Sequence, residues 1–226
     1  MLKNKFYLLS LILIVFLESF NIQTITEVKY LPLGDSYTIC TGATEKESWP
    51  VIMTQHLNEA KIKTTLPFNP SKNGFSTQNV IDQELPVFRF HKPNFVTLLI
   101  GVNDWVRQVP TETFKKNLLY ILDEVQNGLP DKSKVILITI PDFGVTPQGM
   151  NFSGGRDISK GLTEFNDIIK EEGKKRNLPV VDIFWISKNM KTDKTLVAED
   201  GLHPSAKEYG IWEKLIFKEA VKLLKK

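Results

Sequence analysis

A serine, a histidine and an aspartate in this chain have the types and the spacing that nucleophilic catalysis requires. Ser36 directly follows an apolar segment, and Asp200 precedes His203 by three residues. A serine hydroxyl is a poor nucleophile unless a base accepts its proton, and histidine is the side chain suited to that task near pH 7. The imidazole in turn needs a carboxylate that holds its tautomer and stabilises its cation. A turn over residues 200–203 would let Asp200 supply that carboxylate locally.

Two further segments offer hydrogen-bond donors for a reaction of this kind. Gly74 lies in the segment Asn-Gly-Phe-Ser-Thr, and Asn103 lies in Gly-Val-Asn-Asp. A tetrahedral oxyanion needs two or three donors. The backbone N–H groups of Ser36 and Gly74 and the side-chain amide of Asn103 are available for that purpose. Trp105, which follows the segment Gly-Val-Asn-Asp directly, either packs at the rim of such a site or forms part of the wall of an acyl or sugar subsite.

Each of these segments also has an ordinary structural explanation. Segment 34–36 consists of turn-forming residues, and segment 200–204 is typical of the entry into a helix with proline near its start. Segment 103–104 would also serve as a helix cap. The catalytic interpretation therefore depends on whether the fold brings the four segments to one place.

The hydrophobic pattern predicts strands and helices that alternate along the chain. Apolar runs predict strands at 27–33, 62–67, 94–100, 134–140 and 179–184. Amphipathic spacing predicts helices at 48–61, 77–87, 114–125 and 158–175, and a last helix that starts near Ser205. We expect Pro86 to interrupt the second helix, and the series Ser205-Ala-Lys-Glu208 matches a capping box for the last one.

This alternation predicts a parallel sheet covered by helices on both faces. Right-handed crossovers place the carboxyl ends of all strands along one edge, which is where such sheets bind ligands. Ser36 follows the first predicted strand, Gly74 the second and Asn103 the third, and the segment with His203 directly precedes the last helix. We therefore expect the four segments to converge at this edge, with the loop 141–157 beside them.

Composition limits the class of protein. The chain has 226 residues, which suits one domain, and its 29 Lys and Arg against 26 Asp and Glu give a net charge of +3. No block of basic residues interleaves with aromatic residues, so the sequence does not indicate a nucleic-acid partner. The single cysteine, Cys40, excludes an intramolecular disulfide and a zinc site built from cysteines. We expect Cys40 to be buried as a small hydrophobic residue.

The N-terminus predicts export. Lys3 and Lys5 precede the apolar run 6–17, which is too short to span a membrane comfortably and has the length of a signal-peptide core. Residues 18–24 contain no small-x-small cleavage site, and no cysteine follows for a lipoprotein anchor. We therefore predict that residues 1–21 are a signal peptide or membrane-targeting segment of a secreted or periplasmic protein. If residues 1–21 are not cleaved, they are the protein's only contact with the membrane, and residues 22–226 form one domain.

The four polar segments resemble the four sequence blocks of the SGNH hydrolases, also called GDSL esterases and lipases. They appear in the family's order, at residues 34–36, 74, 101–104 and 200–204. The resemblance covers the chain from about residue 28 to its end. It implies an α/β fold, a flavodoxin-like three-layer α/β/α sandwich with about five parallel strands in its central sheet. It also implies a protein without a metal or an organic cofactor.

The resemblance assigns a role to each site residue. It implies that Ser36 is the nucleophile, His203 the general base and Asp200 the carboxylate that orients it. Ser36, Gly74 and Asn103 would form the oxyanion hole. The sequence departs from the family in two places, because residues 37–40 replace the commoner Leu or Ile after Ser36 and the second block is reduced to Gly74 and Ser76.

The function expected from these features is a monomeric serine esterase or acylhydrolase that cleaves a carboxylic ester. A carbohydrate O-acetylesterase and a lysophospholipase or thioesterase are alternatives within the family, so the substrate is a small-molecule, lipid or carbohydrate ester. A non-catalytic module that binds a carbohydrate or acyl ligand is the alternative from a different class. No Gly-x-Ser-x-Gly elbow is present, because segment 74–78 lacks the last glycine, and this disfavours the α/β-hydrolase fold.

Overall fold

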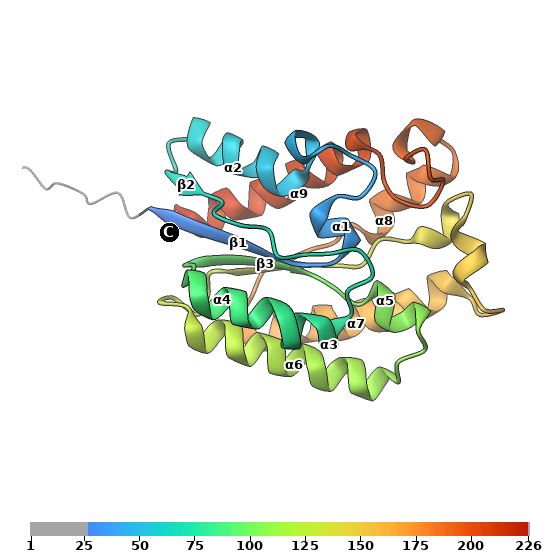
Figure 1. Ribbon diagram of the computed structural model, residues 1–226, viewed down its shortest axis with the longest axis horizontal. Coiled ribbons are helices and arrows are strands. Elements are labelled where there is room, and N and C mark those ends of the chain that lie inside the picture. The colour runs from blue at the N-terminus through green and yellow to red at the C-terminus, as the bar shows by residue number, and fades with distance from the viewer. Residues whose placement is uncertain (1–26, 226) are drawn as a thin grey trace, which may run out of the picture.

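A five-stranded parallel sheet forms the centre of the protein in the computed structural model, which describes residues 27–225 (Figure 1). Its strands are β1 (Val28–Gly34), β2 (Thr64–Thr65), β3 (Phe95–Leu99), β4 (Val135–Ile138) and β5 (Val180–Val181). Their order across the sheet is β2-β1-β3-β4-β5, and all neighbouring pairs are parallel. This confirms the predicted flavodoxin-like fold class.

The two edge strands are shorter than the sequence pattern predicts. β2 has two residues of the six predicted at 62–67, and Pro67, which cannot donate to a ladder, soon follows it. β5 has two residues of the predicted 179–184. There the Asp182 side chain accepts a hydrogen bond from Phe184 N at 3.1 Å and begins the helix α8 (Phe184–Ser187). The apolar runs therefore predicted where these two strands lie but not where they end.

Helices cover both faces of the sheet, which gives three layers (Figure 1). One face carries α2 (Trp49–Glu59) and α9 (Ala206–Leu224), which pack against each other. The other face carries α4 (Leu85–His91), α6 (Thr111–Gly128) and α7 (Ile158–Arg176). The α6 residues predicted to face the core are all buried, namely Phe114, Leu118, Ile121, Leu122 and Val125.

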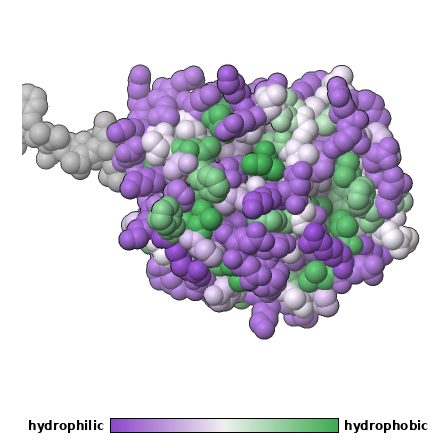
Figure 2. All heavy atoms as spheres, viewed as in Figure 1, coloured by the Kyte–Doolittle hydropathy of each residue, from purple (hydrophilic) through white to green (hydrophobic). Residues whose placement is uncertain are grey.

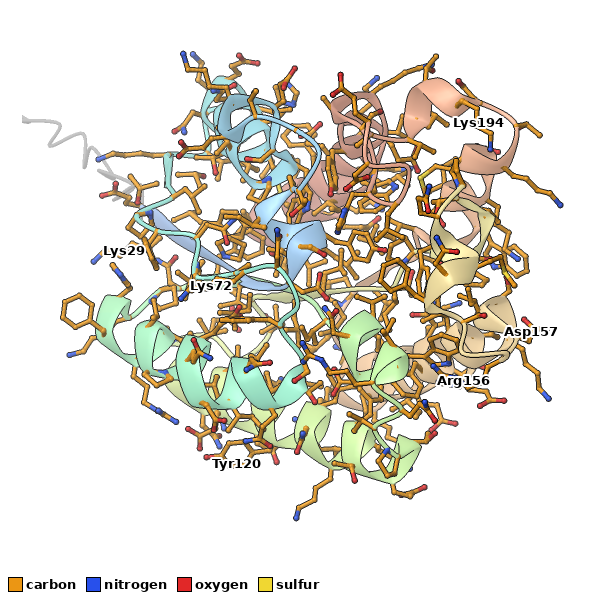
Figure 3. All side chains as sticks on the ribbon, turned by 45° about the vertical axis from the view of Figure 1, so that its right-hand side comes forward. Lys29, Lys72, Tyr120, Arg156, Asp157 and Lys194 are labelled. Carbon is orange, nitrogen blue, oxygen red and sulfur yellow. The ribbon has the colours of Figure 1, made fainter. Side chains whose placement is uncertain are left out.

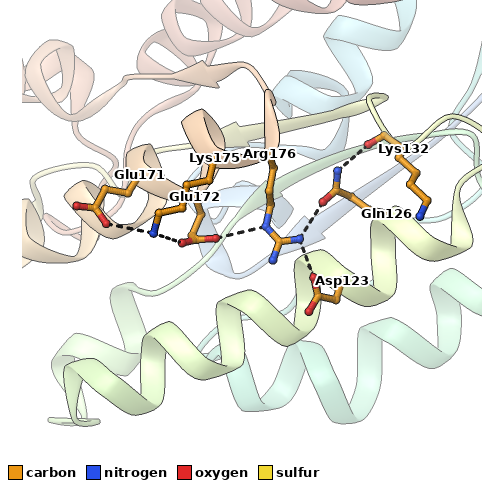
Figure 4. A network of polar contacts seen from close by, with 7 residues as sticks. All are labelled: Asp123, Gln126, Lys132, Glu171, Glu172, Lys175 and Arg176. Carbon is orange, nitrogen blue, oxygen red and sulfur yellow. Dashed lines mark hydrogen bonds and ion pairs between the residues drawn. The ribbon is translucent and has the colours of Figure 1, made fainter.

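A network of polar contacts joins α6 and α7 on the outside of this second layer (Figure 4). Arg176 at the end of α7 contacts Asp123 Oδ1 at 2.7 Å and Gln126 Oε1 at 2.9 Å on α6, and Glu172 on its own helix. Lys175 pairs with the same Glu172 at 2.9 Å. Asp123 and Lys175 are exposed, so their ion pairs contribute modestly to stability. In the view of Figure 2, hydrophilic side chains cover most of the surface and apolar ones form scattered patches.

The helix after residue 76 differs from the prediction, because Pro86 does not end it. The chain forms α3 (Thr77–Asn79), a π-helical turn η2 (Val80–Glu84) and then α4. The N–H of Leu85 bonds to Val80 O, which is the i→i+5 spacing of a π-helix. Pro86 therefore lies in the first turn of α4, where proline is tolerated.

The remaining elements are short and lie at the carboxyl edge of the sheet or beside it. They are α1 (Ser36–Ile39), η1 (Glu45–Glu47), α5 (Val102–Val106), η3 (Phe143–Val145), η4 (Gly149–Phe152), η5 (Lys188–Lys191) and η6 (Lys194–Leu196). At the start of α9, Ser205 accepts a hydrogen bond from Glu208 N, but the Glu208 side chain bonds to Trp212 Nε1 instead of completing the predicted capping box.

Two features of the sequence analysis concern export and contact with a membrane. The predicted signal segment, residues 1–21, lies outside the described residues. Between residues 27 and 225, no helix combines the length and the apolar character that crossing a membrane requires.

Candidate active site

Ser36 is the first residue of the short helix α1, two residues after the end of the interior strand β1. Asp35 caps this helix, because its Oδ1 accepts a hydrogen bond from Tyr37 N at 2.9 Å. Gly34 makes the tight connection possible, since a Cβ at this position would overlap Thr38 Oγ1 and Leu99 O. Ser36 is 6% exposed. As the first residue of the helix it has a backbone N–H with no partner inside the helix, so that donor is available to a ligand.

His203 and Asp200 form a pair within one turn before α9. His203 Nδ1 lies 2.6 Å from Asp200 Oδ2. Because a carboxylate only accepts hydrogen bonds, Nδ1 carries the proton and Nε2 keeps its lone pair. The other carboxylate oxygen, Oδ1, accepts the backbone N–H groups of Leu202 and His203, each at 2.9 Å. Burial raises the pKa of Asp200. The hydrogen bonds from these two N–H groups and from the imidazole lower the pKa by more than burial raises it, so the net pKa lies below its usual range. Asp200 is therefore ionised at neutral pH.

The histidine turn packs on the segment that follows Ser36. The ring of Tyr37 lies edge-on to His203 with centroids 6.0 Å apart, and Tyr209 of α9 donates to Thr41 O at 2.9 Å. Gly42 is in close contact with the turn, because a Cβ there would lie 2.6 Å from Ala198 Cβ and 3.6 Å from His203 Cβ. Among residues 27–225, no hydrogen bond joins the Ser36 hydroxyl to His203, and such bonds are often long before substrate binds.

Asn103 contacts the segment that contains Gly74, and this segment also contacts Thr41, which follows α1. Asn103, in α5, donates from Nδ2 to Phe75 O at 2.9 Å, which places its amide beside the segment that contains Gly74. The amide has two protons, so one is left for a ligand. Gly74 has φ +79°, a conformation that glycine adopts readily, and the preceding Asn73 accepts a hydrogen bond from Thr41 Oγ1. All four predicted segments therefore lie around the helix that begins at Ser36.

Asp104 is a structural residue of this site that sequence reasoning considered only as a possible cap. It is 1% exposed, and its carboxylate accepts hydrogen bonds from Thr77 N at 2.9 Å and Thr77 Oγ1 at 2.5 Å. Burial raises the pKa of Asp104, and the bonds from Thr77 offset this only in part. These bonds tie the start of α3 to α5 and so hold Asn103 near Gly74. In the sequence, only the position of Asp104 next to Asn103 indicated that Asp104 belongs to this site.

Trp105 is packed in the interior rather than along an open wall. It is 5% exposed, its ring lies 5.9 Å from that of Phe143, and the guanidinium of Arg156 lies 3.8 Å above it. Arg156 also donates to Trp105 O at 2.8 Å. Figure 3 shows Arg156 and Asp157 next to the start of α7. Of the two roles considered for Trp105, this placement favours rim packing over a substrate subsite.

Two groups bear on alternative chemistries. Cys40 is 1% exposed, and burial raises the pKa of its thiol, which makes it a poor nucleophile at neutral pH. Within the described part of the chain, no group of three or more His, Cys, Asp or Glu side chains is placed to hold a metal ion. Arg107 is exposed near Gly74, where its guanidinium would lie 3.4 Å from an added Cβ.

Comparison with known proteins agrees with this geometry. The chain is 31% identical over 122 residues to a multidomain esterase of Ruminococcus flavefaciens, which is 53% of this chain but 14% of that much longer relative. It is 23% identical over 196 residues to an arylesterase of Vibrio mimicus, which is 87% of this chain and 90% of the relative. The crystal structure of a lipase/acylhydrolase from Enterococcus faecalis has the same fold, with a TM-score of 0.69, 24% identity and coverage of 85% of this chain and 94% of that one.

A family model also matches most of the chain. The model of the GDSL-like Lipase/Acylhydrolase family matches residues 33–211, which include all four polar segments. This confirms the resemblance seen in the sequence. The chain therefore belongs to the GDSL-like lipase/acylhydrolase family of ester-bond hydrolases.

Proposed function

We propose that the protein is a serine esterase that cleaves a carboxylic ester through an acyl-enzyme on Ser36. The observation that carries the proposal is the hydrogen-bonded pair of Asp200 and His203, packed on the helix that begins at Ser36. A buried serine at a helix N-terminus, an imidazole held in one tautomer and separate N–H donors are the parts that acyl transfer needs. A non-catalytic ligand-binding module would not need the tautomer of His203 to be held.

In the first step, the Ser36 hydroxyl attacks the ester carbonyl while His203 Nε2 takes its proton. The carbonyl oxygen becomes an oxyanion, and the N–H groups of Ser36 and Gly74 and the Asn103 amide donate hydrogen bonds to it. The protonated imidazole is stabilised by ionised Asp200 at 2.6 Å. The tetrahedral intermediate collapses when its bond to the alcohol oxygen breaks, and His203 returns the proton to that leaving alcohol.

In the second step, water releases the acid. His203 Nε2 takes a proton from a water molecule as the water oxygen attacks the acyl carbonyl. The same donors hold the second oxyanion. The bond to Ser36 Oγ then breaks, the proton passes from His203 to that oxygen, and the free enzyme is restored.

We also infer that a groove next to α1 takes an acyl or alcohol group larger than acetyl, and of α1 this groove is lined by Ile39 and not by Ser36. It has a volume of about 790 Å³, runs between α2 and segment 64–69, and reaches α1 at Ile39. Ile39 is 39% exposed and Phe68, on the opposite wall, is 50% exposed. Ser36 and Ile39 are three residues apart in the same helix and so lie on one side of it. We infer that the apolar part of the ester lies along Ile39 and Phe68.

The experiment that tests the nucleophile uses a fluorophosphonate probe and a p-nitrophenyl ester on three proteins: wild type, Ser36→Ala and the control Ser133→Ala. Ser133 is exposed and far along the chain from the site, beside Asp131. The wild type and the control should be labelled and active, whereas Ser36→Ala should lose both properties and keep its melting temperature. Unlabelled wild-type protein would favour a binding module, and an active Ser36→Ala protein would move the nucleophile elsewhere.

The substrate is tested by a series of p-nitrophenyl esters of increasing acyl length beside acetylated sugars. If the groove takes the apolar group, Phe68→Ala should reduce kcat/KM for the longer esters and leave that for acetate unchanged. Equal losses for all lengths would remove Phe68 from the substrate path. Preference for acetylated sugars would instead favour a carbohydrate O-acetylesterase.

We also propose that the domain acts outside the cytoplasm as a monomer. The charged start and apolar run within residues 1–21 support export. Fractionation of cells that express the full chain, with N-terminal sequencing of the product and sedimentation of the purified protein, tests this proposal. A cytoplasmic product that keeps its first residues would contradict export.

A further inference from the structure

Two buried carboxyl groups lie directly behind the turn that presents Ser36. Asp35 and Glu84 are both 0% exposed. Asp35 uses Oδ1 to cap α1, while its Oδ2 is buried with no hydrogen-bond partner among the described residues. Glu84 Oε2 accepts a hydrogen bond from Gly34 N at 2.9 Å, and its Oε1 is likewise buried and unpartnered within residues 27–225. The esterase mechanism proposed above uses neither carboxyl group.

Glu84 supplies an acceptor that the sheet itself does not provide at this point. On one side, β1 pairs with β3 along its length up to Gly34 and Leu99. On the other side, β2 pairs only with Val28 and Lys29 and ends before it reaches Gly34. The Glu84 side chain therefore bonds the last N–H of the strand, two residues before Ser36. A buried backbone N–H without an acceptor would be costly, so this bond matters for the turn.

The π-helical turn η2 is the element that presents Glu84. Glu84 is its last residue, and the turn packs against β1. A π-turn holds one more residue than an α-helical turn, so it changes the direction of the side chains at its end. Such turns are frequent at functional sites, and this one places a carboxyl group inside the sheet–helix interface, 50 residues along the chain from Gly34.

The surroundings favour the neutral form of Glu84. Burial raises the pKa of Glu84 well above its usual range, the Gly34 N–H offsets part of this, the charge of Asp35 raises the pKa further and Lys72 lowers it slightly. Burial also raises the pKa of Asp35 to about 8, with a contribution from the charge of Asp104. These surroundings therefore favour a protonated carboxyl group, whose Oε2 accepts from Gly34 N.

We propose that Glu84 is a positioning residue for the nucleophile, and that its carboxyl oxygen holds Gly34 N–H and thereby the orientation of the Ser36 turn. The surroundings described above favour the neutral form for this task. This inference rests on the proposed role of Ser36. A neutral acceptor has an advantage over a charged one here. A buried negative charge behind the turn would repel the oxyanion that forms in front of it.

The test compares Glu84→Gln, Glu84→Met and the control Gln83→Met, which changes an exposed neighbour in the same turn. Glutamine keeps an acceptor oxygen for Gly34 N–H and has an N–H group where a protonated Oε1 has its O–H. Methionine has a similar shape but does not accept this bond. The measurements are kcat and KM for a p-nitrophenyl ester, the rate of Ser36 labelling by a fluorophosphonate, and the melting temperature.

At pH 7 the Gln variant and the control should stay close to wild type. The Met variant should lose about 10-fold to 100-fold in kcat and in labelling rate, with KM changed little, because small displacements of a reacting atom have effects of this size. Wild-type kcat and labelling in a folded Met variant would overturn the proposal. So would an equal loss in the Gln variant, because that variant keeps the neutral acceptor.

A second measurement keeps the proposal falsifiable if the Met variant fails to fold. An acid whose pKa is raised in the folded state binds its proton more tightly there than in the unfolded chain, so its contribution to stability falls as pH rises from its unfolded pKa toward its folded one. The melting temperature of Glu84→Gln should therefore rise relative to wild type between pH 5 and pH 9. A fall over this range would show that Glu84 is stabilised as a charged group, and would overturn the proposal.

The labelling assay also separates this inference from the function on which it rests. If Ser36→Ala protein is active, the nucleophile is elsewhere and the proposed function fails. If Ser36 is labelled in every variant at the wild-type rate, the esterase proposal stands and only the role of Glu84 fails.

Discussion

The two halves of the active site are held in place by different means. In the nucleophile half, the supporting carboxyl groups of Asp35, Glu84 and Asp104 are at most 1% exposed. Glu84 and Asp104 bond to residues 50 and 27 positions away. In the histidine half, the Asp200 side chain is 41% exposed and that of His203 is 17% exposed. There the hydrogen bonds of Asp200 join residues two or three positions apart.

This difference predicts which substitutions should affect activity without affecting stability. The histidine half is built by a local turn in contact with solvent, so a change there removes chemistry and leaves the fold. The supporting carboxyl groups of the nucleophile half are part of the core, so a change at one of them should affect both, because a buried polar group that loses its partner destabilises the folded state.

The largest expected effect is in the histidine half. Asp200→Asn should lower kcat by about 10⁴-fold, because an amide in this place no longer holds the required tautomer or stabilises the imidazolium. The melting temperature should change little, since the amide oxygen still accepts the N–H groups of Leu202 and His203. Steady-state kinetics and thermal unfolding measure both. A loss of kcat below tenfold would remove Asp200 from the catalytic set.

Asp104→Ala is the corresponding change in the nucleophile half. It leaves the buried Thr77 N–H and hydroxyl without their acceptor and should lower the free energy of unfolding by about 3 kcal/mol. Because α5 is then no longer tied to α3, kcat should also fall, by about 10-fold to 100-fold. Urea unfolding and ester kinetics on the same sample test the coupling. An effect on activity alone would contradict the contrast between the halves.

A pair of glycine substitutions tests how tightly the nucleophile turn is packed. Gly34→Ala should destabilise the protein by about 1–3 kcal/mol, because the new Cβ overlaps Thr38 Oγ1 and Leu99 O. Gly210→Ala in α9 is the matched control, since no atom of residues 27–225 outside its own helix lies within 4 Å of the added Cβ, and it should stabilise by about 0.5–1 kcal/mol. Thermal unfolding of both variants is sufficient. Equal shifts of the same sign would show that the turn has room to spare.

The smallest expected effect concerns the acid stability of the histidine half. The pKa of Asp200 is lowered in the folded state, so its contribution to stability is present above its unfolded pKa, near 3.9, and is lost as pH falls below that. Because the side chain is largely exposed, solvent screening limits this contribution to ~0.5 kcal/mol. Between pH 5 and pH 3, wild type should lose slightly more stability than Asp200→Asn. A larger loss in the variant would reverse the sign of the shift.

The parts of the fold that follow from local pattern were predictable from the sequence. The α6 stripe and the apolar runs of β1, β3 and β4 depend on residue spacing, and the structure has these elements close to their predicted bounds. The course of the chain through Pro86 was not predictable. The π-helical turn just before it depends on contacts with β1, which spacing alone does not reveal.

The sequence is sufficient to predict the fold class, the family and the four segments that contain the candidate catalytic residues. Residue type and order are sufficient for these, since parallel strands bring their carboxyl ends to one edge wherever they occur. Three features depend on tertiary contacts. Trp105 packs under Arg156, and Asp104 ties α5 to α3. Glu84 bonds to the turn before Ser36. The physical reason is burial. Whether a carboxyl group is neutral or charged, and whether a ring faces solvent or the core, depends on neighbours that lie tens of residues away in the chain.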